Sequence, residues 1–291
     1  MSTIKRFDFT SVLGWSVSRY DRFLNCKRQY FYDYYSKFEK EIPYEKINFL
    51  KSLTSKVLES GNIVHDAIRD VLERLKKSSK PINKDKLFKY VFTMTENYCK
   101  SKFFFESYYK KEVVMVPEIF DKVKVCIEEF ISSQTFDWIL NKAIDQRSEW
   151  IIEPEGFGET RIGSLKAYCK VDFLFPIDNK VYIFDWKTGK PNEKKHSKQL
   201  TGYSLWAGYH FNKFACDISA AVVYLFPKYN VKKINIAEED IKKFEQTVEK
   251  ESNEMYGYLL DVESNIPKDK KEFPINKNKL CDYCNYQELC K

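Results

Sequence analysis

The sequence predicts an α/β protein in which a mixed β-sheet carries a large helical lobe on its N-terminal side. Two observations lead to this fold class. Apolar residues recur at helical spacing in the first half of the chain, whereas short β-prone runs alternate with helical stretches after about residue 147. The composition agrees, because 43% hydrophobic residues with only 9 Gly and 9 Pro among 291 residues exclude disordered, collagen-like and low-complexity proteins.

The first half is expected to consist mainly of helices. Within residues 61–77, apolar side chains repeat every three or four positions, which is the pattern of one buried helical stripe. The stripe consists of Val64, Ile68, Val71, Leu72 and Leu75. A Ser-Ser-Lys-Pro sequence at 78–81 ends this helix. Further helices, rich in aromatic residues and lysine, are predicted over about 16–38, 84–110 and 117–141.

The second half is expected to supply the sheet. Three strands are predicted at Trp150–Ile152, Ser164–Phe175 and Lys180–Trp186. A turn at Pro176–Asn179 joins the last two as a hairpin. The remaining elements are a helix near 195–212, an apolar strand over Ile218–Phe226, a short strand at 231–236 and a helix over about 238–260. The order helix, three strands, helix, strand indicates a mixed core.

These patterns divide the chain into three parts. Residues 1–145 are expected to form the helical lobe and residues 146–262 the α/β core. Residues 263–291 are expected to form a linker and a cysteine clasp that packs back on the N-terminus. The lysine-rich segment from Lys268 to Lys279 is interpreted as the solvated linker.

Charge and hydropathy indicate the kind of partner and the cellular location to expect. The 49 basic and 42 acidic side chains leave a net charge of +7, which suits a polyanionic partner but is also common among lysine-rich proteins. The opening MSTIKRFDFT lacks the apolar run of a signal peptide, and no window approaches the apolar length that a membrane helix needs. A cytoplasmic protein without a membrane partner is expected.

The cysteines predict a metal site. Eight cysteines in a reducing compartment are not expected to form disulfides. Cys281, Cys284 and Cys290 lie within ten residues, and Cys26, in a polar and aromatic segment near the other end, is the expected fourth ligand. Four thiolates suit either zinc or an iron–sulfur cluster, and spacing alone slightly favours zinc. The remaining four are interpreted as ordinary thiols: Cys99, Cys126, Cys169 and Cys216.

The segment Asp185-Trp-Lys187 is the strongest candidate for a catalytic site. Because side chains alternate along a strand, Asp185 and Lys187 share one face and their aromatic neighbours lie on the other. The hairpin is expected to bring Asp172, at the end of the paired strand, close to Asp185. Two converging carboxylates form the oxygen-rich site that Mg²⁺ or Mn²⁺ prefers. A lysine beside them can neutralise charge or orient a water, which equips the site to hydrolyse a phosphodiester.

Several motifs in a fixed order carry a resemblance to a known family. The ordered set resembles the RecB-type branch of the PD-(D/E)XK nuclease superfamily. The motifs are Gly61-x-x-x-His65, Asp172, Asp185-Trp-Lys187-Thr-Gly and Gln199-Leu-Thr-Gly-Tyr203. The resemblance extends from Ser16 through Cys26 to the C-terminal cysteines and leaves the helices of about 80–145 unmatched. The run before Asp172, Lys-Ala-Tyr-Cys-Lys-Val, departs from the small residue that the family usually has there.

The resemblance implies a restriction-endonuclease-like core of the order αβββαβ and assigns roles to the motif residues. Asp172 and Asp185 resemble the metal-binding carboxylates, and Lys187 resembles the catalytic lysine. His65 is similar to an extra metal ligand supplied by a preceding helix. The pair that positions DNA or supports the lysine corresponds to Gln199 and Tyr203. An upstream acid that completes the site is either Glu149 or Glu153.

One early and three late cysteines are similar to the pattern of iron–sulfur nucleases, namely the AddB helicase–nuclease subunit and the CRISPR-associated spacer-acquisition nuclease. This implies a structural [4Fe–4S] cluster near the DNA path in place of zinc, bound by Cys26, Cys281, Cys284 and Cys290. Basic side chains on the early helices are then candidates for phosphate contacts: Arg19, Arg22, Lys27 and Arg28.

The resulting hypothesis is a DNA nuclease that depends on Mg²⁺ or Mn²⁺ and acts as an exonuclease on DNA with a single-stranded end. Its expected setting is DNA processing, repair and recombination, or phage- and CRISPR-related defence, with a helicase or a CRISPR integrase as candidate partner. The alternative is a non-catalytic DNA-binding or scaffold subunit of a helicase–nuclease or integration complex.

Overall fold

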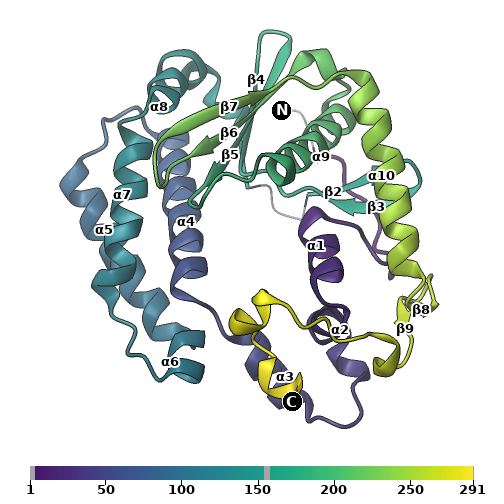
Figure 1. Ribbon diagram of the computed structural model, residues 1–291. Helices are drawn as coiled ribbons and strands as arrows, with labels where there is room; N and C mark the ends of the chain where they lie inside the picture. The colour runs from purple at the N-terminus through teal and green to yellow at the C-terminus, as the bar shows by residue number, and fades with distance from the viewer. Residues whose placement is uncertain (1–3, 154–157, 291) are drawn as a thin grey trace.

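A computed structural model of the protein describes residues 4–153 and 158–290. A five-stranded mixed sheet lies between a helical lobe, formed by α4 to α8, and the helices α9 and α10 (Figure 1). The mixed α/β fold with an N-terminal helical region, predicted from the sequence, is therefore confirmed. Within the described ranges, no helix is both long and apolar enough to cross a membrane.

The central sheet has the strand order β1-β4-β5-β6-β7. Its strands are β1 (Ile151–Ile152), β4 (Phe173–Ile177), β5 (Lys180–Lys187), β6 (Ile218–Tyr224) and β7 (Asn230–Ile234). The pairs β1–β4, β4–β5 and β6–β7 are antiparallel. Strands β5 and β6 are parallel, and the crossover between them is α9 (Glu193–Phe211). The hairpin turn is shorter than predicted, because Pro176 and Ile177 still pair with β5 and leave Asp178 and Asn179 at the turn.

The strand predicted over Ser164–Phe175 is wrong as a single element. Its first part is β3 (Leu165–Tyr168), which pairs with β2 (Glu159–Ile162) in a separate two-stranded sheet. The backbone of Trp15 hydrogen-bonds to both Lys166 and Tyr168, so β3 is held against the N-terminal segment. The chain then crosses at residues 169–172 and joins the central sheet at β4. Strand propensity is continuous through this region, but the pairing partner changes within it.

The predicted helices are shorter than expected because backbone contacts interrupt them. Residues 16–38 form α1 (Val17–Asn25) and α2 (Lys27–Tyr35), separated by Cys26 in an extended conformation. Residues 84–110 form α5 (Lys84–Ser101) and α6 (Phe105–Lys110). Between them, the carbonyl of Phe103 accepts a hydrogen bond from Thr54 N at 2.9 Å. Residues 117–141 contain α7 (Val116–Ile131) and α8 (Gln134–Trp138), and the sequence did not predict α3 (Tyr44–Ser52).

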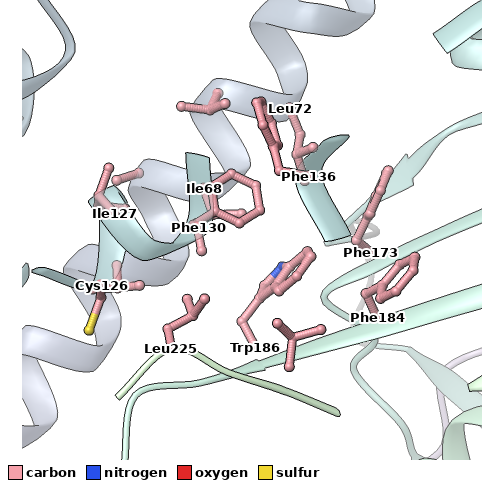
Figure 2. Packing of buried hydrophobic residues seen from close by; sticks show 14 of the residues in the cluster. Ile68, Leu72, Cys126, Ile127, Phe130, Phe136, Phe173, Phe184, Trp186 and Leu225 are labelled. Carbon is pink, nitrogen blue, oxygen red and sulfur yellow. The ribbon is translucent and has the colours of Figure 1, made fainter. Parts of the chain in front are cut away.

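Helix α4 (Lys56–Lys77) contains the predicted apolar stripe and begins earlier than expected, since Ser55 caps it by accepting a hydrogen bond from Leu58 N. The stripe packs with α7 and one face of the sheet (Figure 2). At the centre of this core, Trp186 is 1% exposed, with its ring 5.1 Å from Phe130 and stacked on Phe184 at 5.8 Å. The core therefore joins the helical lobe to β5.

Alternation along β5 directs its side chains to two different cores. Phe184 and Trp186 belong to the core shared with α4 and α7. Val181 and Ile183 belong to a second core, which contains Leu200 and other residues of α9. Because residues two apart share a face, Asp185 and Lys187 lie on the α9 side of the strand, as the alternation predicted.

The C-terminal region packs on the N-terminal helices. After α10 (Glu238–Tyr256) come β8 (Leu259–Asp261) and β9 (Ile266–Pro267), and the chain then runs along α2 and α3 (Figure 1). Phe273 is fully buried, with its ring 5.1 Å from the rings of Phe31 and Tyr258. Lys270 Nζ lies 2.9 Å from a Glu39 carboxylate oxygen. This segment is therefore anchored at Lys270 and Phe273, while most of its other residues are exposed, and its interpretation as a solvated linker stays a prediction.

We expect Trp186→Ala to lower the free energy of unfolding by about 3–5 kcal/mol, because it leaves a cavity where the helical lobe meets β5. Urea unfolding followed by circular dichroism measures the change. Phe214→Ala is the matched control, since Phe214 is 71% exposed and its loss should cost less than about 0.5 kcal/mol. Equal effects of the two substitutions would contradict this description of the core.

Candidate active site

Asp185 and Lys187 occupy the C-terminal end of β5. The Asp185 side chain is 1% exposed, and Lys187 Nζ lies 2.5 Å from Asp185 Oδ2. Neither oxygen of Asp185 has a hydrogen-bond partner of suitable geometry within the described part of the chain. A buried carboxylate normally has several partners, so Asp185 Oδ1 in particular is left without compensation.

Asp172 lies directly before β4, opposite the end of β5. The neighbouring residues Phe173 and Phe184 pair across the hairpin, and Trp186 N donates a hydrogen bond to Asp172 Oδ2 at 2.9 Å. The sequence placed Asp172 at the end of a strand; the structure places it before one, because the chain changes sheets at residues 169–172. The expected closeness to Asp185 is nevertheless present, since the Asp172 carboxylate contributes to raising the pKa of Asp185 and both carboxylates feel the charges of His65 and Lys187.

His65 enters the site from α4. Its Nδ1 atom lies 3.5 Å from Asp172 Oδ2. Gly61, one turn earlier on α4, explains how the helix reaches the sheet end, because a Cβ atom there would lie 3.2 Å from Thr188 Oγ1. The spacing Gly-x-x-x-His thus places a close backbone approach and an imidazole on the same side of one helix.

Three groups of the site have a shifted pKa: Asp172, Asp185 and His65. Burial raises the pKa of Asp185 to about 6, although Lys187 opposes this. Burial also raises the pKa of Asp172, but the attraction of His65 and Lys187 is stronger and the net pKa is lowered. For His65, burial lowers the pKa, while the Asp172 carboxylate raises it and determines the net increase. One carboxylate is therefore held ionised, and the other is buried without sufficient positive charge.

Gln199 and Tyr203 lie one turn apart on α9 and contact each other, with Gln199 Nε2 donating to the Tyr203 hydroxyl. Tyr203 is 4% exposed. Burial, followed by the negative charges of Asp185 and Asp172, raises its pKa well above the usual value. Tyr203 therefore stays protonated beside the carboxylates, and the structure brings this predicted pair to the site.

Two pockets flank the carboxylates. One, of about 380 Å³, is lined from α4 and α5 and contains His65 and Asp172. The other, of about 200 Å³, lies between α1 and α9 and contains Gln199 and Tyr203. Lys170 lines both. The first pocket also contains residues that sequence reasoning missed, because their places on α4 and α5 carry no motif: Glu59, Asn62, Asp66, Tyr98 and Lys102.

The structure distinguishes the two acids that the sequence left open. Glu153 lines the pocket with His65 and Asp172, and its backbone N–H donates to the Asp172 carbonyl at 2.9 Å. Its Oε2 atom lies 3.0 Å from Lys170 Nζ and 3.9 Å from Arg69 Nη1. Glu149 ends the 3₁₀ segment Ile144–Glu149 and is not among the residues that line this pocket.

The donor chemistry of the site fits a divalent cation. Carboxylate oxygens from Asp172 and Asp185 are the ligands that Mg²⁺ and Mn²⁺ prefer, and Asp185 Oδ1 is buried without a partner. Over residues 4–153 and 158–290, however, no three His, Cys, Asp or Glu side chains are already arranged to hold one ion. The ammonium of Lys187 stands next to Asp185 in this arrangement.

The four cysteines predicted as ligands line one cavity of about 290 Å³. Cys26 comes from the break between α1 and α2, whereas Cys281, Cys284 and Cys290 come from the C-terminal segment. All of them are free thiols. The structure thus brings the two ends of the chain to one cavity, with the thiols around its wall rather than gathered at one point.

The basic residues of the early helices are largely engaged in internal contacts. Arg19 donates to the Gly14 carbonyl, and Arg28 Nε donates to the Phe273 carbonyl at 2.9 Å. Lys27 Nζ lies 4.2 Å from the centre of the Phe23 ring. Arg22 pairs with Asp33, and its side chain is 43% exposed. Arg28 thus fastens the C-terminal segment, a role that the sequence did not indicate, and phosphate binding by these residues stays a prediction.

The mixed sheet thus brings two carboxylates and a lysine to one end, beside a histidine from a flanking helix. The chain belongs to the PD-(D/E)XK nuclease superfamily, whose family model matches residues 14–291. Nucleases of this superfamily generally use divalent metals.

The solved structures that match the chain include the following two. One, described as a "putative exonuclease" from Eubacterium rectale, has a TM-score of 0.49 and 12% identity, and the match covers 94% of this chain and 87% of that one. The structure of SSO0001 has a TM-score of 0.29 and 18% identity, with 64% and 78% covered. No curated protein matches the chain.

We expect Asp185→Asn to stabilise the metal-free protein by about 1–3 kcal/mol at pH 7.5. Burial raises the pKa of Asp185 from 3.8 to about 6, so the folded state binds more protons than the unfolded state between these values. Stability is therefore lost as the pH rises through this window, and the loss persists above it. The asparagine removes that penalty.

Thermal unfolding in EDTA measures this effect, and repetition in Mn²⁺ measures metal binding. The wild-type protein should gain stability with Mn²⁺, whereas Asp185→Asn should gain little. Asp178→Asn, at the exposed turn at the other end of β5, is the matched control and should leave both results unchanged. A destabilised Asp185→Asn protein in EDTA would contradict the description of Asp185 as an uncompensated charge.

Proposed function

We propose that the protein is a divalent-metal-dependent deoxyribonuclease that hydrolyses phosphodiester bonds. The observation that supports this most directly is the buried Asp172–Asp185 pair, with Lys187 and His65 against it, at one end of the sheet. Two buried carboxylates are costly for a protein that binds no cation, especially since neither oxygen of Asp185 has a hydrogen-bond partner within the described residues. Membership of the PD-(D/E)XK superfamily supports the same chemistry.

In this proposal Asp172 and Asp185 hold the cation, with His65 as a further ligand. When bound, a divalent ion supplies positive charge to the scissile phosphate and makes a water more acidic. Because the pKa of Asp172 is lowered, its carboxylate is ready to bind the ion at neutral pH. Glu153 is the acid that we assign to complete the site, since it lines the same pocket and contacts the backbone of Asp172.

Lys187 and the α9 pair complete the catalytic machinery. The Lys187 ammonium, 2.5 Å from Asp185, can donate a hydrogen bond to the attacking water or to a phosphate oxygen. Tyr203 remains a neutral hydroxyl because burial and the nearby carboxylates raise its pKa. Gln199 donates to that hydroxyl, which orients it. The pair can therefore position DNA without adding charge.

We also propose that Cys26, Cys281, Cys284 and Cys290 bind a [4Fe–4S] cluster. The cavity that they line measures about 290 Å³, and no three of these thiols are close enough to hold a single ion. Four thiolates are the ligands that such a cluster needs, and the pattern of one early and three late cysteines is the one for which the resemblance implies it. The group would add a covalent connection between the two chain ends, while Arg28 and Phe273 already hold them together.

We further propose that the chain acts on DNA with a free single-stranded end. In this view, residues 1–145 form a mainly helical part that includes α1 to α3 and the lobe of α4 to α8. Residues 146–262 form the nuclease core, and residues 263–291 form the segment that closes on the N-terminus. The lobe is more than a support, because its helix α4 contributes His65. A helicase or an integrase remains the proposed kind of partner, and processing, repair or defence the proposed setting.

For the nuclease itself, we expect Asp185→Ala and Lys187→Ala each to lower kcat by about 10²–10³-fold with Mg²⁺ or Mn²⁺, since each removes a charge next to the scissile phosphate. Cleavage of 5′-labelled single- and double-stranded DNA measures the rates. Lys180→Ala, at the exposed N-terminal end of the same strand, is the control and should retain wild-type activity.

Linear and circular DNA substrates distinguish exonuclease from endonuclease action. An exonuclease should degrade linear single-stranded DNA and leave a circle of the same sequence intact. Wild-type rates in both Asp185→Ala and Lys187→Ala would defeat the site assignment. DNA binding without cleavage under either metal would support the alternative of a scaffold subunit.

For the cysteine cavity, anaerobically purified protein is expected to be coloured and to contain about four iron atoms per chain. Cys281→Ala should lose most of this iron and the visible absorbance, whereas Cys216→Ala, which removes an exposed thiol outside the cavity, should retain both. Metal analysis and absorption spectra measure the outcome. A colourless, zinc-loaded wild-type protein would refute the cluster.

A further inference from the structure

Lys170 stands at the junction of the two pockets that flank the candidate site. It lines the pocket of α4 and α5 together with Asp172, and it also lines the pocket of α1 and α9 together with Tyr203. Its side chain is 64% exposed, whereas that of Lys187 is 19% exposed. The two lysines beside the carboxylates are therefore in different surroundings, one enclosed and one open to solvent.

The backbone around Lys170 is held in place, whereas its side chain is 64% exposed. Its neighbours Cys169 and Val171 are 3% and 0% exposed, and Cys169 N donates to the Gly158 carbonyl at 2.8 Å. The buried side chains of Cys169 and Val171 anchor the segment between β3 and β4. Lys170, which lies between them, consequently points into the pockets.

Lys170 can leave its ion pair with Glu153 and bind another anion instead. Lys170 Nζ lies 3.0 Å from Glu153 Oε2, and Arg69 Nη1 lies 3.9 Å from the same oxygen. When Lys170 turns to another anion, Glu153 keeps a cation nearby, so no buried charge is left alone. Because the Lys170 side of this pair is 64% exposed, solvent screens the interaction and lowers the cost of the exchange.

We propose that Lys170 binds the DNA phosphate next to the scissile one and so determines how the strand lies across Asp172 and Asp185. This inference rests on the proposed function and names a positioning residue for it. A strand that crosses the carboxylates from one pocket to the other passes Lys170, because this residue belongs to the wall of both. A lysine binds phosphate as a point charge, so the contact is independent of base sequence.

DNA binding in EDTA tests this without cleavage, by fluorescence anisotropy of a labelled single-stranded oligonucleotide at several salt concentrations. We expect Lys170→Ala to raise Kd about five- to tenfold and to reduce the slope of log K against log salt by about 0.7, the amount for one phosphate on a single strand. Lys170→Arg should restore both quantities. Lys180→Ala, which removes an exposed lysine from the far end of β5, should change neither.

Steady-state kinetics distinguish a residue that positions DNA from one that takes part in the reaction. With Mn²⁺, Lys170→Ala should raise KM by a factor similar to its Kd and change kcat less than about threefold. An unchanged salt slope, or a loss of binding that Lys170→Arg fails to restore, would overturn the proposal. A wild-type protein that binds but never cleaves would refute the nuclease while the Lys170 effect on binding could still be measured. Absence of any DNA binding would refute both.

Discussion

The structure depends on one electrostatic constraint, which is that two carboxylates are buried side by side at the end of a hairpin. Asp172 and Asp185 are 9% and 1% exposed, and taking such charges from water costs several kcal/mol each unless they are compensated. Lys187 and His65 supply only part of that compensation, because Asp185 still has an oxygen without a hydrogen bond. The charge of Asp185 is therefore incompletely compensated within the described residues, and a bound cation would relieve this imbalance.

The aromatic core provides the rigidity that such a site requires. Trp186 lies between Asp185 and Lys187, the two candidate site residues of β5, and packs against Phe130 and Phe184 (Figure 2). Its own backbone N–H reaches Asp172. Packing on one face of the strand thus determines where the charged side chains of the other face point, and the large helical lobe on that face directly supports the site.

Helix α4 connects the core of the helical lobe to the candidate site. Its apolar stripe packs in the core, Gly61 allows it to approach Thr188, and His65 then reaches Asp172. The C-terminal segment in a similar way connects the N-terminal helices to the cysteine cavity. Phe273 packs against Phe31, and Arg28 holds its carbonyl, so the cysteine cavity is formed by ordinary packing and hydrogen bonding. Any metal bound there would reinforce an interface that already exists.

The sequence by itself determined the fold class, the buried stripe of α4 and the direction of Asp185 and Lys187, because each follows from local periodicity or alternation. Only the tertiary structure decided that residues 164–175 divide between two sheets, that Lys270 and Phe273 anchor an apparent linker, and that Glu153 rather than Glu149 lines the pocket. These features depend on partners distant in the chain. A residue's own neighbours in sequence carry no information about which strand, carboxylate or aromatic ring will meet it after folding.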